Sequence, residues 1–223
     1  MKKVILVLGV LALTLEMNAQ KDITQFLDIP VDGYKPEMIQ KLKSRGFTIN
    51  QHEEDILDGE FNGTNVHISI QTNNNKVWRI AVLEANYTDE TNIKIKFNNL
   101  IQQFVNNKRY STQSDSTIAK FNIPKDEDIS YEIAVNNKRY EASFYQKSVK
   151  YDSLINESDL LVAKDTLNDK ENDRFYALME ETIKVSLNSL NKGVWFMIDE
   201  DYRKYRILIF YENEYNKANG EGL

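Results

Sequence analysis

LDGEFNGTNVHISIQTNNNKVWRIAV, residues 57–82, is the stretch that decides the fold. Apolar and polar residues alternate on both sides of Asn62-Gly63, a dipeptide typical of a two-residue type I′ turn, because both central residues of that turn need positive φ. A second turn is predicted at residues 73–76. A third strand follows, with three side chains expected on one face: Trp78, Ile80 and Val82. The result is an antiparallel meander whose apolar face needs cover.

The segments on either side of the meander have the pattern of helices. The first helix is predicted to begin near Pro36, because proline fits the first helical position. It should end at Gly46 as a left-handed cap, with Phe47 placed to contact Leu42. The second is predicted to be capped by Thr88 or Asp89 and to run to about residue 107. Its apolar stripe contains Ile93, Phe97, Leu100, Ile101 and Phe104.

The second half of the chain alternates in the same way. Residues 129–135 and 140–144 read as two strands of a hairpin that turns at Asn136-Asn137, after a polar loop at 111–120. Residues 145–169 have no steady period and read as a polar excursion with at most one short helical turn. Residues 171–190 form a long helix, which is expected to cover one face of a final hairpin over 194–211. The apolar stripe of that helix contains Phe175, Leu178, Met179, Ile183, Leu187 and Leu190.

These elements define an α+β fold: a mostly antiparallel sheet, made of a meander and hairpins, with helices packed on one face. The expected division is a signal peptide at 1–19, an α+β unit at 20–110 and a second α+β unit at 111–223. Whether the two units are similar halves, or one continuous domain, stays open at this stage.

The N-terminus indicates export. Lys2-Lys3 precede an apolar run over residues 4–15, and Ala19 supplies a small residue at the expected cleavage point, which together are typical of a secretory signal peptide. The run is too short to span a bilayer comfortably, so no stable membrane anchor is expected after cleavage. The chain contains no cysteine, so neither disulfides nor a lipid-modified cysteine are available. A periplasmic or secreted protein is predicted.

Charge and residue inventory exclude several functions. The net charge of −6 is spread along the chain, whereas nucleic-acid binding needs a concentrated cationic surface. Without cysteine there is no thiol nucleophile or thiolate metal site. His52 lies beside acidic residues in a predicted turn, and His67 falls in the polar phase of a strand, so neither has metal-ligand or triad spacing. We expect no cofactor, no metal and no catalytic residue.

Two acidic clusters keep an enzymatic alternative open. Residues 126–128 and 199–201 each read Asp-Glu-Asp, and a pair of carboxylates is all that a glycoside hydrolase requires. Both clusters fall at strand ends or turns, where acids are common solubilising residues. Neither has the residue order of a calcium loop.

Aromatic residues supply the candidate binding site. The strands of the last hairpin are apolar on both faces, which is normal for strands that are covered on both faces. The predicted helix can cover only one of them, so the other must meet the rest of the protein, a second copy of the chain or a ligand. The predicted binding patch consists of Trp195, Tyr205, Leu208 and Phe210.

Four segments carry a family resemblance. The chain resembles small exported proteins of host-associated Gram-negative anaerobes at residues 26–33, 41–47, 195–202 and 210–216, which read FLDIPVDG, KLKSRGF, WFMIDEDY and FYENEYN. The helix followed by a meander is also similar in topology to small α+β units of periplasmic inhibitor and assembly-factor proteins. These resemblances imply an exported location and transfer no catalytic site.

The sequence therefore predicts an exported cell-envelope protein that acts as a non-enzymatic binding or interaction module. Its expected partner is a protein, a peptide or a glycan, and a homodimer is a further possibility. The alternative is an acid-pair hydrolase acting on a polysaccharide or a peptidoglycan fragment.

Overall fold

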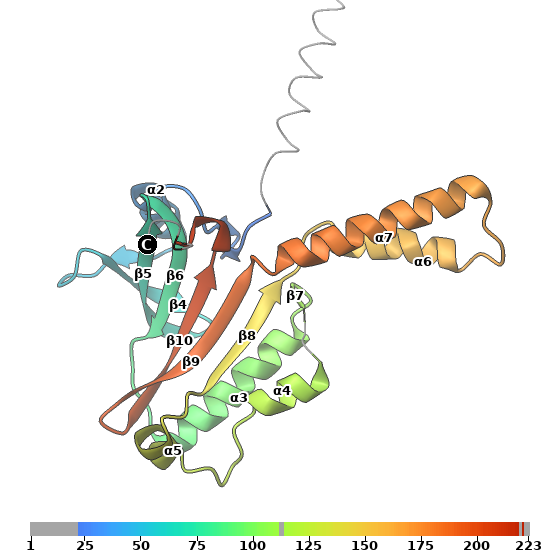
Figure 1. The fold of residues 1–223 in the computed structure, drawn as a ribbon. Helices are drawn as coiled ribbons and strands as arrows, with labels where there is room; N and C mark the ends of the chain where they lie inside the picture. The colour runs from blue at the N-terminus through green and yellow to red at the C-terminus, as the bar shows by residue number, and fades with distance from the viewer. Residues whose placement is uncertain (1–21, 112–113, 219, 221–223) are drawn as a thin grey trace, which may run out of the picture.

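The computed structural model describes residues 22–111, 114–218 and 220. Its centre is an eight-stranded antiparallel sheet with the strand order β3-β4-β5-β6-β10-β9-β8-β7 (Figure 1). The strands are β3 (Thr48–Ile49), β4 (Ile56–Phe61), β5 (Thr64–Asn73), β6 (Lys76–Glu84), β7 (Tyr110–Ser111), β8 (Glu141–Gln146), β9 (Gly193–Asp201) and β10 (Lys204–Glu212). A separate small hairpin pairs β1 (Gln25–Phe26) with β2 (Ile29–Pro30).

Helices pack against this sheet, so the predicted α+β class is confirmed. The six described α-helices are α2 (Lys35–Ser44), α3 (Glu90–Asn106), α4 (Asp115–Phe121), α5 (Ile129–Asn136), α6 (Tyr151–Val162) and α7 (Asp169–Ser189), and a 3₁₀ turn, η1 (Glu214–Asn216), follows β10. Within the described ranges, no helix is long and apolar enough to cross a membrane. The signal peptide predicted at 1–19 lies outside the described residues.

One continuous core joins both halves of the chain. α3 places Phe97 and Phe104 against Phe196 of β9, with ring centroids 5.1 and 5.4 Å apart. Met38 and Leu42 of α2 are fully buried in the same cluster. Because β10 pairs with β6, the strands of residues 20–110 and those of residues 111–223 belong to one sheet.

The turn predictions at the start of the chain are confirmed. Asn62 and Gly63 have φ of +51° and +74°, and Phe61 pairs with Thr64 across the turn, which is the type I′ hairpin that the Asn-Gly dipeptide favours. At the end of α2, the Phe47 N–H donates to the Leu42 carbonyl (3.2 Å) and the Gly46 N–H to the Lys43 carbonyl (3.1 Å). This pair of bonds is the Schellman ending that was expected there.

Helix α3 begins where the sequence placed it. The carboxylate of Asp89 accepts a hydrogen bond from the Asn92 N–H (2.9 Å), so Asp89 rather than Thr88 is the cap. Ile93, Phe97, Ile101 and Phe104 are buried along one side of the helix, as the spacing predicted.

The hairpin predicted around Asn136-Asn137 is wrong. Residues 129–136 form helix α5, capped by the side chain of Asp128, and only the second predicted strand exists, as β8. The alternation misled because residues four apart also share one side of a helix. Ile129 is fully buried, whereas Tyr131 and Val135 are 54% and 56% exposed. The prediction of a polar loop at 111–120 is also wrong in part, because helix α4 begins at Asp115.

The polar excursion predicted at 145–169 is also wrong, because it contains the twelve-residue helix α6. α6 pairs with α7, and the two form a helical hairpin that projects away from the sheet (Figure 1). Leu154 of α6 and Leu178 of α7 are buried, and Arg174 donates two hydrogen bonds to Glu157 across the pair (2.7 and 2.8 Å). The expectation that residues 171–190 cover the final hairpin is therefore wrong.

Strand β6 departs from its predicted register. Arg79 lies opposite Gln71 and Val77 lies opposite Thr72, so Trp78 is the extra residue of a β-bulge. Trp78 does not join Ile80 and Val82 in the core as predicted. Its ring instead meets the Arg79 guanidinium, whose central carbon lies 4.1 Å from the ring centroid.

Candidate functional site

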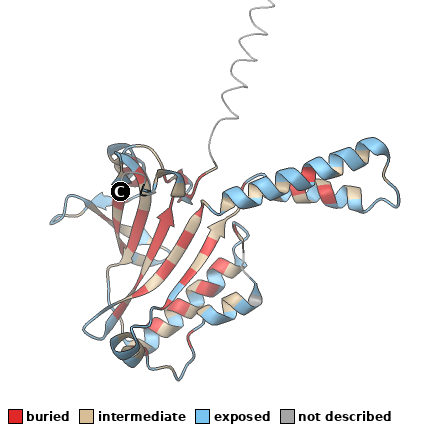
Figure 2. Cartoon of the chain, viewed as in Figure 1, coloured by how far each residue is buried: buried red, intermediate tan, exposed pale blue. Residues whose placement is uncertain are grey.

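Strand register divides the sheet into two unlike faces. One face carries the core residues that α2, α3 and α5 cover, such as Ile68, Val82, Phe196 and Ile209. The side chains that alternate with these core residues point to the opposite face of the sheet. We call it the open face, because the buried apolar residues of α2, α3 and α5 all belong to the core on the first face. Figure 2 shows the corresponding alternation of buried and half-buried residues along β9 and β10.

Six apolar side chains form a block at the centre of the open face. Ala81, Phe210 and Trp195 are direct cross-strand neighbours on β6, β10 and β9. Two residues further along these strands, Leu83, Leu208 and Met197 repeat the arrangement. Ala81 and Phe210 are each 7% exposed, and the other four are half-buried. We call this block the open-face patch.

An arginine and three aromatic rings build one end of the patch. The Trp195 and Phe210 rings stack with centroids 4.2 Å apart and an interplanar angle of 27°. The Arg79 guanidinium carbon lies 4.6 Å from the Phe210 centroid and 4.1 Å from that of Trp78. These contacts explain why Phe210 is nearly covered, and they place a cation between two aromatic rings.

Glu212 fixes this arrangement electrostatically. It lies opposite Arg79 on the neighbouring strand, forms an ion pair with it, and accepts a hydrogen bond from Trp195 Nε1–H (2.9 Å). Burial by itself raises the pKa of the Glu212 carboxyl, but the Trp195 hydrogen bond and the charge of Arg79 outweigh burial and hold the pKa below its usual 4.5. Glu212 therefore stays ionised and orients both Arg79 and Trp195.

A second cross-strand ion pair closes the other end of the patch. Arg206 Nε donates to Asp199 Oδ2 (2.8 Å), and these two residues are direct neighbours on β10 and β9. The Arg206 guanidinium carbon also lies 4.3 Å from the Tyr87 ring centroid. The patch is thus an apolar centre with a paired arginine and carboxylate at each end.

The structure brings together three of the four residues proposed from sequence. Trp195, Leu208 and Phe210 are all in the patch. Tyr205 is not, because its odd-numbered position on β10 turns it to the core face, where it is 1% exposed and its hydroxyl lies 2.6 Å from Ser130 Oγ. Sequence reasoning missed Arg79 and the β6 residues, since their place beside β10 depends on a long-range strand pairing.

The two histidines have ordinary surroundings. His52 is exposed, and its backbone N–H donates to the side chain of Asn50 (2.8 Å). His67 lies on the open face and contacts Asp58, with 2.7 Å between Nδ1 and Oδ1. Among the described residues there is no group of three or more His, Asp or Glu side chains that could hold a metal ion.

The acidic clusters serve local structure. Glu127 pairs with Lys138 and Tyr140, and its pKa is lowered by these hydrogen bonds. Asp128 caps α5, and Asp199 pairs with Arg206. In the part of the chain that the structure describes, every carboxyl group with a shifted pKa is shifted downward.

A cleft also opens on the helical side of the sheet, between α3 and the β4–β5 turn. Its volume is about 370 Å³, and the hydrogen bond from Asn62 Nδ2 to Gln103 Oε1 (2.8 Å) crosses from the turn to the helix. The lining is mostly apolar and aromatic: Phe61, Leu100, Phe104, Tyr110, Ile209 and Tyr211. None of the described residues that line this cleft is a carboxylate or a histidine.

Comparison of the chain with protein-family models, curated proteins and solved structures finds no match.

Proposed function

We propose that this protein is an exported, non-enzymatic binding protein of the cell envelope, and that its open-face patch binds a polypeptide partner. The observation that carries the proposal is the patch itself: six apolar side chains in register on β6, β10 and β9, bounded at each end by a cross-strand arginine–carboxylate pair. Protein interfaces combine an apolar, aromatic centre with a polar rim in this way, and Trp and Arg are enriched among the residues that dominate binding.

The shape of the patch favours a polypeptide over a small molecule. Small ligands bind mainly in concave cavities, whereas this patch is part of a sheet surface. Three strands at a spacing of about 4.8 Å, and two rows of side chains about 7 Å apart, give a frame that matches one face of a helix or one extended segment. The accessible apolar surface of the patch comes from its four half-buried members, Leu83, Met197, Leu208 and Trp195.

The export component rests on the N-terminal sequence. Lys2-Lys3, the apolar run and Ala19 support a cleaved signal peptide, and the lack of cysteine supports release without a lipid anchor. A protein released into the envelope with an apolar patch on its sheet fits a role in capture or inhibition of another polypeptide.

Selection from a random peptide library displayed on phage tests the binding proposal. Peptides enriched on the purified protein should contain several apolar side chains, and titration calorimetry should show at least about a tenfold loss of affinity for Leu208→Asp, because the charge would be desolvated in the interface. Leu160→Asp is the matched control, since Leu160 lies on α6, outside the patch, and is 71% exposed. Equal binding to both variants, or enrichment of glycans instead of peptides in a parallel glycan screen, would contradict the proposal.

A further inference from the structure

The long helix α7 carries an apolar stripe that the described part of the chain leaves uncovered. Its members are Tyr176, Met179, Ile183, Leu187 and Leu190, the last being the C-cap, with exposures of 70, 43, 56, 60 and 53%. At 3.6 residues per turn the five lie within an arc of about 80° and extend over about 21 Å. Figure 2 shows α7 exposed along nearly its whole length.

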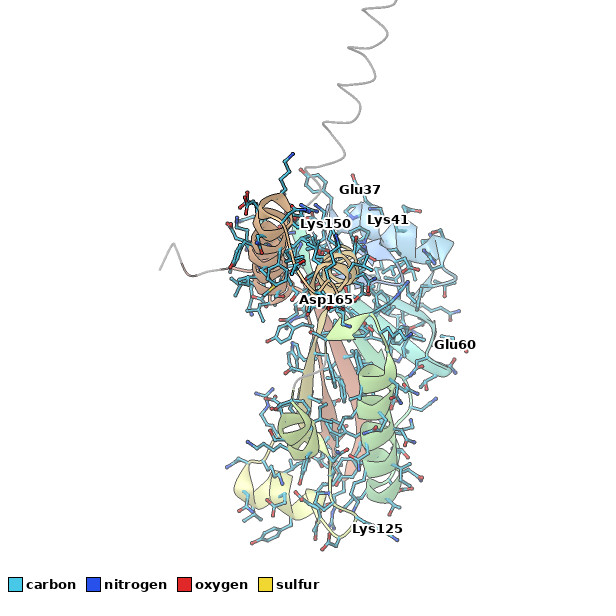
Figure 3. All side chains as sticks on the ribbon, turned by 90° about the vertical axis from the view of Figure 1, so that its right-hand side faces the viewer. Glu37, Lys41, Glu60, Lys125, Lys150 and Asp165 are labelled. Atoms are coloured by element: carbon cyan, nitrogen blue, oxygen red, sulfur yellow. The ribbon has the colours of Figure 1, made fainter. Side chains whose placement is uncertain are left out.

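The stripe faces away from α6. Leu178 is the buried residue of α7, and Arg174 reaches across to Glu157 of α6; at 100° per residue these two lie about 140° and 180° around the helix from Ile183. Figure 3, which looks at the hairpin from its free end, shows α6 and α7 side by side above the sheet, with Lys150 and Asp165 labelled at the two ends of α6. The stripe is therefore available on the outer side of the hairpin.

The spacing of the stripe is symmetric about Ile183. Its members lie seven and four residues before Ile183 and four and seven residues after it. If a second copy of α7 packs antiparallel on the first, with the two-fold axis at Ile183, then Tyr176 meets Leu190 of the second copy and Met179 meets Leu187. A surface that is its own complement in this way is what a two-fold symmetric dimer requires.

Charges beside the stripe are complementary in the same arrangement. Glu180 and Lys184 lie on one flank of the stripe and already pair within the helix (2.7 Å). In an antiparallel two-fold pair, like flanks meet, and Glu180 of one copy then lies about 3 Å along the axis from Lys184 of the other, a separation of two residues. Two further ion pairs thus become possible, and such flanking charges set partner and orientation in helix pairs.

We propose that the α6–α7 hairpin is a homodimerisation element, through which two copies of the chain associate by antiparallel packing of α7 centred on Ile183. The contact covers about 21 Å by 10 Å on each copy, or roughly 400 Å² in total, which is small for a specific interface. A weak, reversible dimer is therefore expected. This surface is on different elements from the open-face patch, so the proposal does not depend on the proposed function.

Charge-reversed variants test the orientation. The Glu180→Lys protein carries two positive charges beside the centre of the stripe, and the Lys184→Glu protein carries two negative ones. Sedimentation equilibrium should show each variant to be monomeric at concentrations where the unaltered protein is dimeric, and an equimolar mixture should form a heterodimer. A mixture that stays monomeric, or single variants that dimerise as well as the unaltered protein, would overturn the antiparallel arrangement.

Two single-cysteine variants test the centre, because the chain has no cysteine of its own. Ile183→Cys should cross-link two copies under mild oxidation, whereas Tyr176→Cys should not, because the two copies of that position are about 21 Å apart. Ile183→Asp should abolish the dimer without lowering the melting temperature measured at a dilution where the unaltered protein is also monomeric. Ile95→Asp is the matched control, since Ile95 is an isoleucine on α3 with 53% exposure, and it should leave the dimer intact.

The remaining outcomes decide against the proposal. If the unaltered protein is monomeric at several hundred micromolar, it has no such interface. The same conclusion follows if the Ile183→Asp variant dimerises as well as the unaltered protein. Binding of the monomeric protein to phosphatidylglycerol vesicles, abolished by Ile183→Asp, would assign the stripe to a lipid surface instead.

Discussion

The substitution Gly59→Ala probes how tightly the first helix is joined to the sheet. Gly59 lies on β4 opposite Val66, and a Cβ at this position would be 2.3 Å from Cδ1 and 2.7 Å from Cε1 of Phe47. Ordinary contacts begin at 3.4 Å, so the ring would have to move by about 1 Å. Phe47 is 2% exposed and its N–H is bonded to Leu42, so it has little room to retreat. We expect a loss of about 1–3 kcal/mol in the free energy of unfolding.

Urea denaturation followed by circular dichroism measures this loss, and a double-mutant cycle assigns its cause. Phe47→Leu removes the ring that the new methyl group meets. The double variant should therefore lose less free energy of unfolding than the two single variants lose together, by about 0.5–2 kcal/mol. Gly63→Ala is the control, because nothing lies within 4 Å of its Cβ and only its positive φ is strained. The reasoning fails if Gly59→Ala unfolds at the same urea concentration as the unaltered protein, or if its effect adds independently to that of Phe47→Leu.

Three further predictions concern the turn, the buried carboxylate and the N-terminus. Gly63→Val forces a β-branched residue to a φ near +74° and should cost about 1–3 kcal/mol; an unchanged thermal melt would refute the type I′ assignment. Glu212 has a lowered pKa in the folded state, so its contribution to stability is fully present above its usual pKa of 4.5 and is lost as pH falls through the lower folded value. The difference in free energy of unfolding between the unaltered protein and Glu212→Gln should therefore become smaller below pH 4.5. A difference that grows there would show that the pKa of Glu212 is raised in the folded state, not lowered. The intact mass of protein exported by its native host should match a chain that starts at Gln20, whereas a mass that retains residues 4–15 would exclude cleavage.

Local signals in the sequence predicted the elements that local interactions determine. Asn62-Gly63 specifies its turn by backbone conformation alone, and Asp89 and Gly46 specify helix ends by hydrogen bonds that close within a few residues. The same kind of reasoning failed at Ile129 and Ile133, because their spacing suits both a strand and one side of a short helix. The capping side chain of Asp128 was the available signal for the helix.

Part of the candidate site could likewise be predicted from local sequence, and part could not. The faces of β9 and β10 follow from strict alternation, so Trp195, Leu208 and Phe210 could be placed together from sequence, and Tyr205 could have been set apart by the same rule. Arg79 could not be found, because β6 and β10 are far apart in the chain and pair only in the folded sheet. The bulge at Trp78, which takes that ring out of the core, has no signal in the local sequence.

The projecting hairpin shows the limit of amphipathic patterns. The apolar stripe of α7 was visible in the sequence, but an amphipathic pattern says only that a helix needs a partner, not which partner covers it. Arg174 and Glu157 join α7 to α6, a helix hidden in a polar stretch, and this pairing leaves the stripe around Ile183 exposed.

The most direct test of the open-face patch as a binding surface is photo-cross-linking in the living host. A benzophenone amino acid replaces Met197 in the patch, and in a second protein it replaces Tyr131, which is 54% exposed on α5. Irradiation should yield a discrete adduct with another polypeptide from position 197 and none from position 131, and Leu208→Asp should abolish the adduct. Equal adducts from both positions, or an adduct from position 197 that persists in the Leu208→Asp protein, would contradict the assignment of the patch as the binding surface.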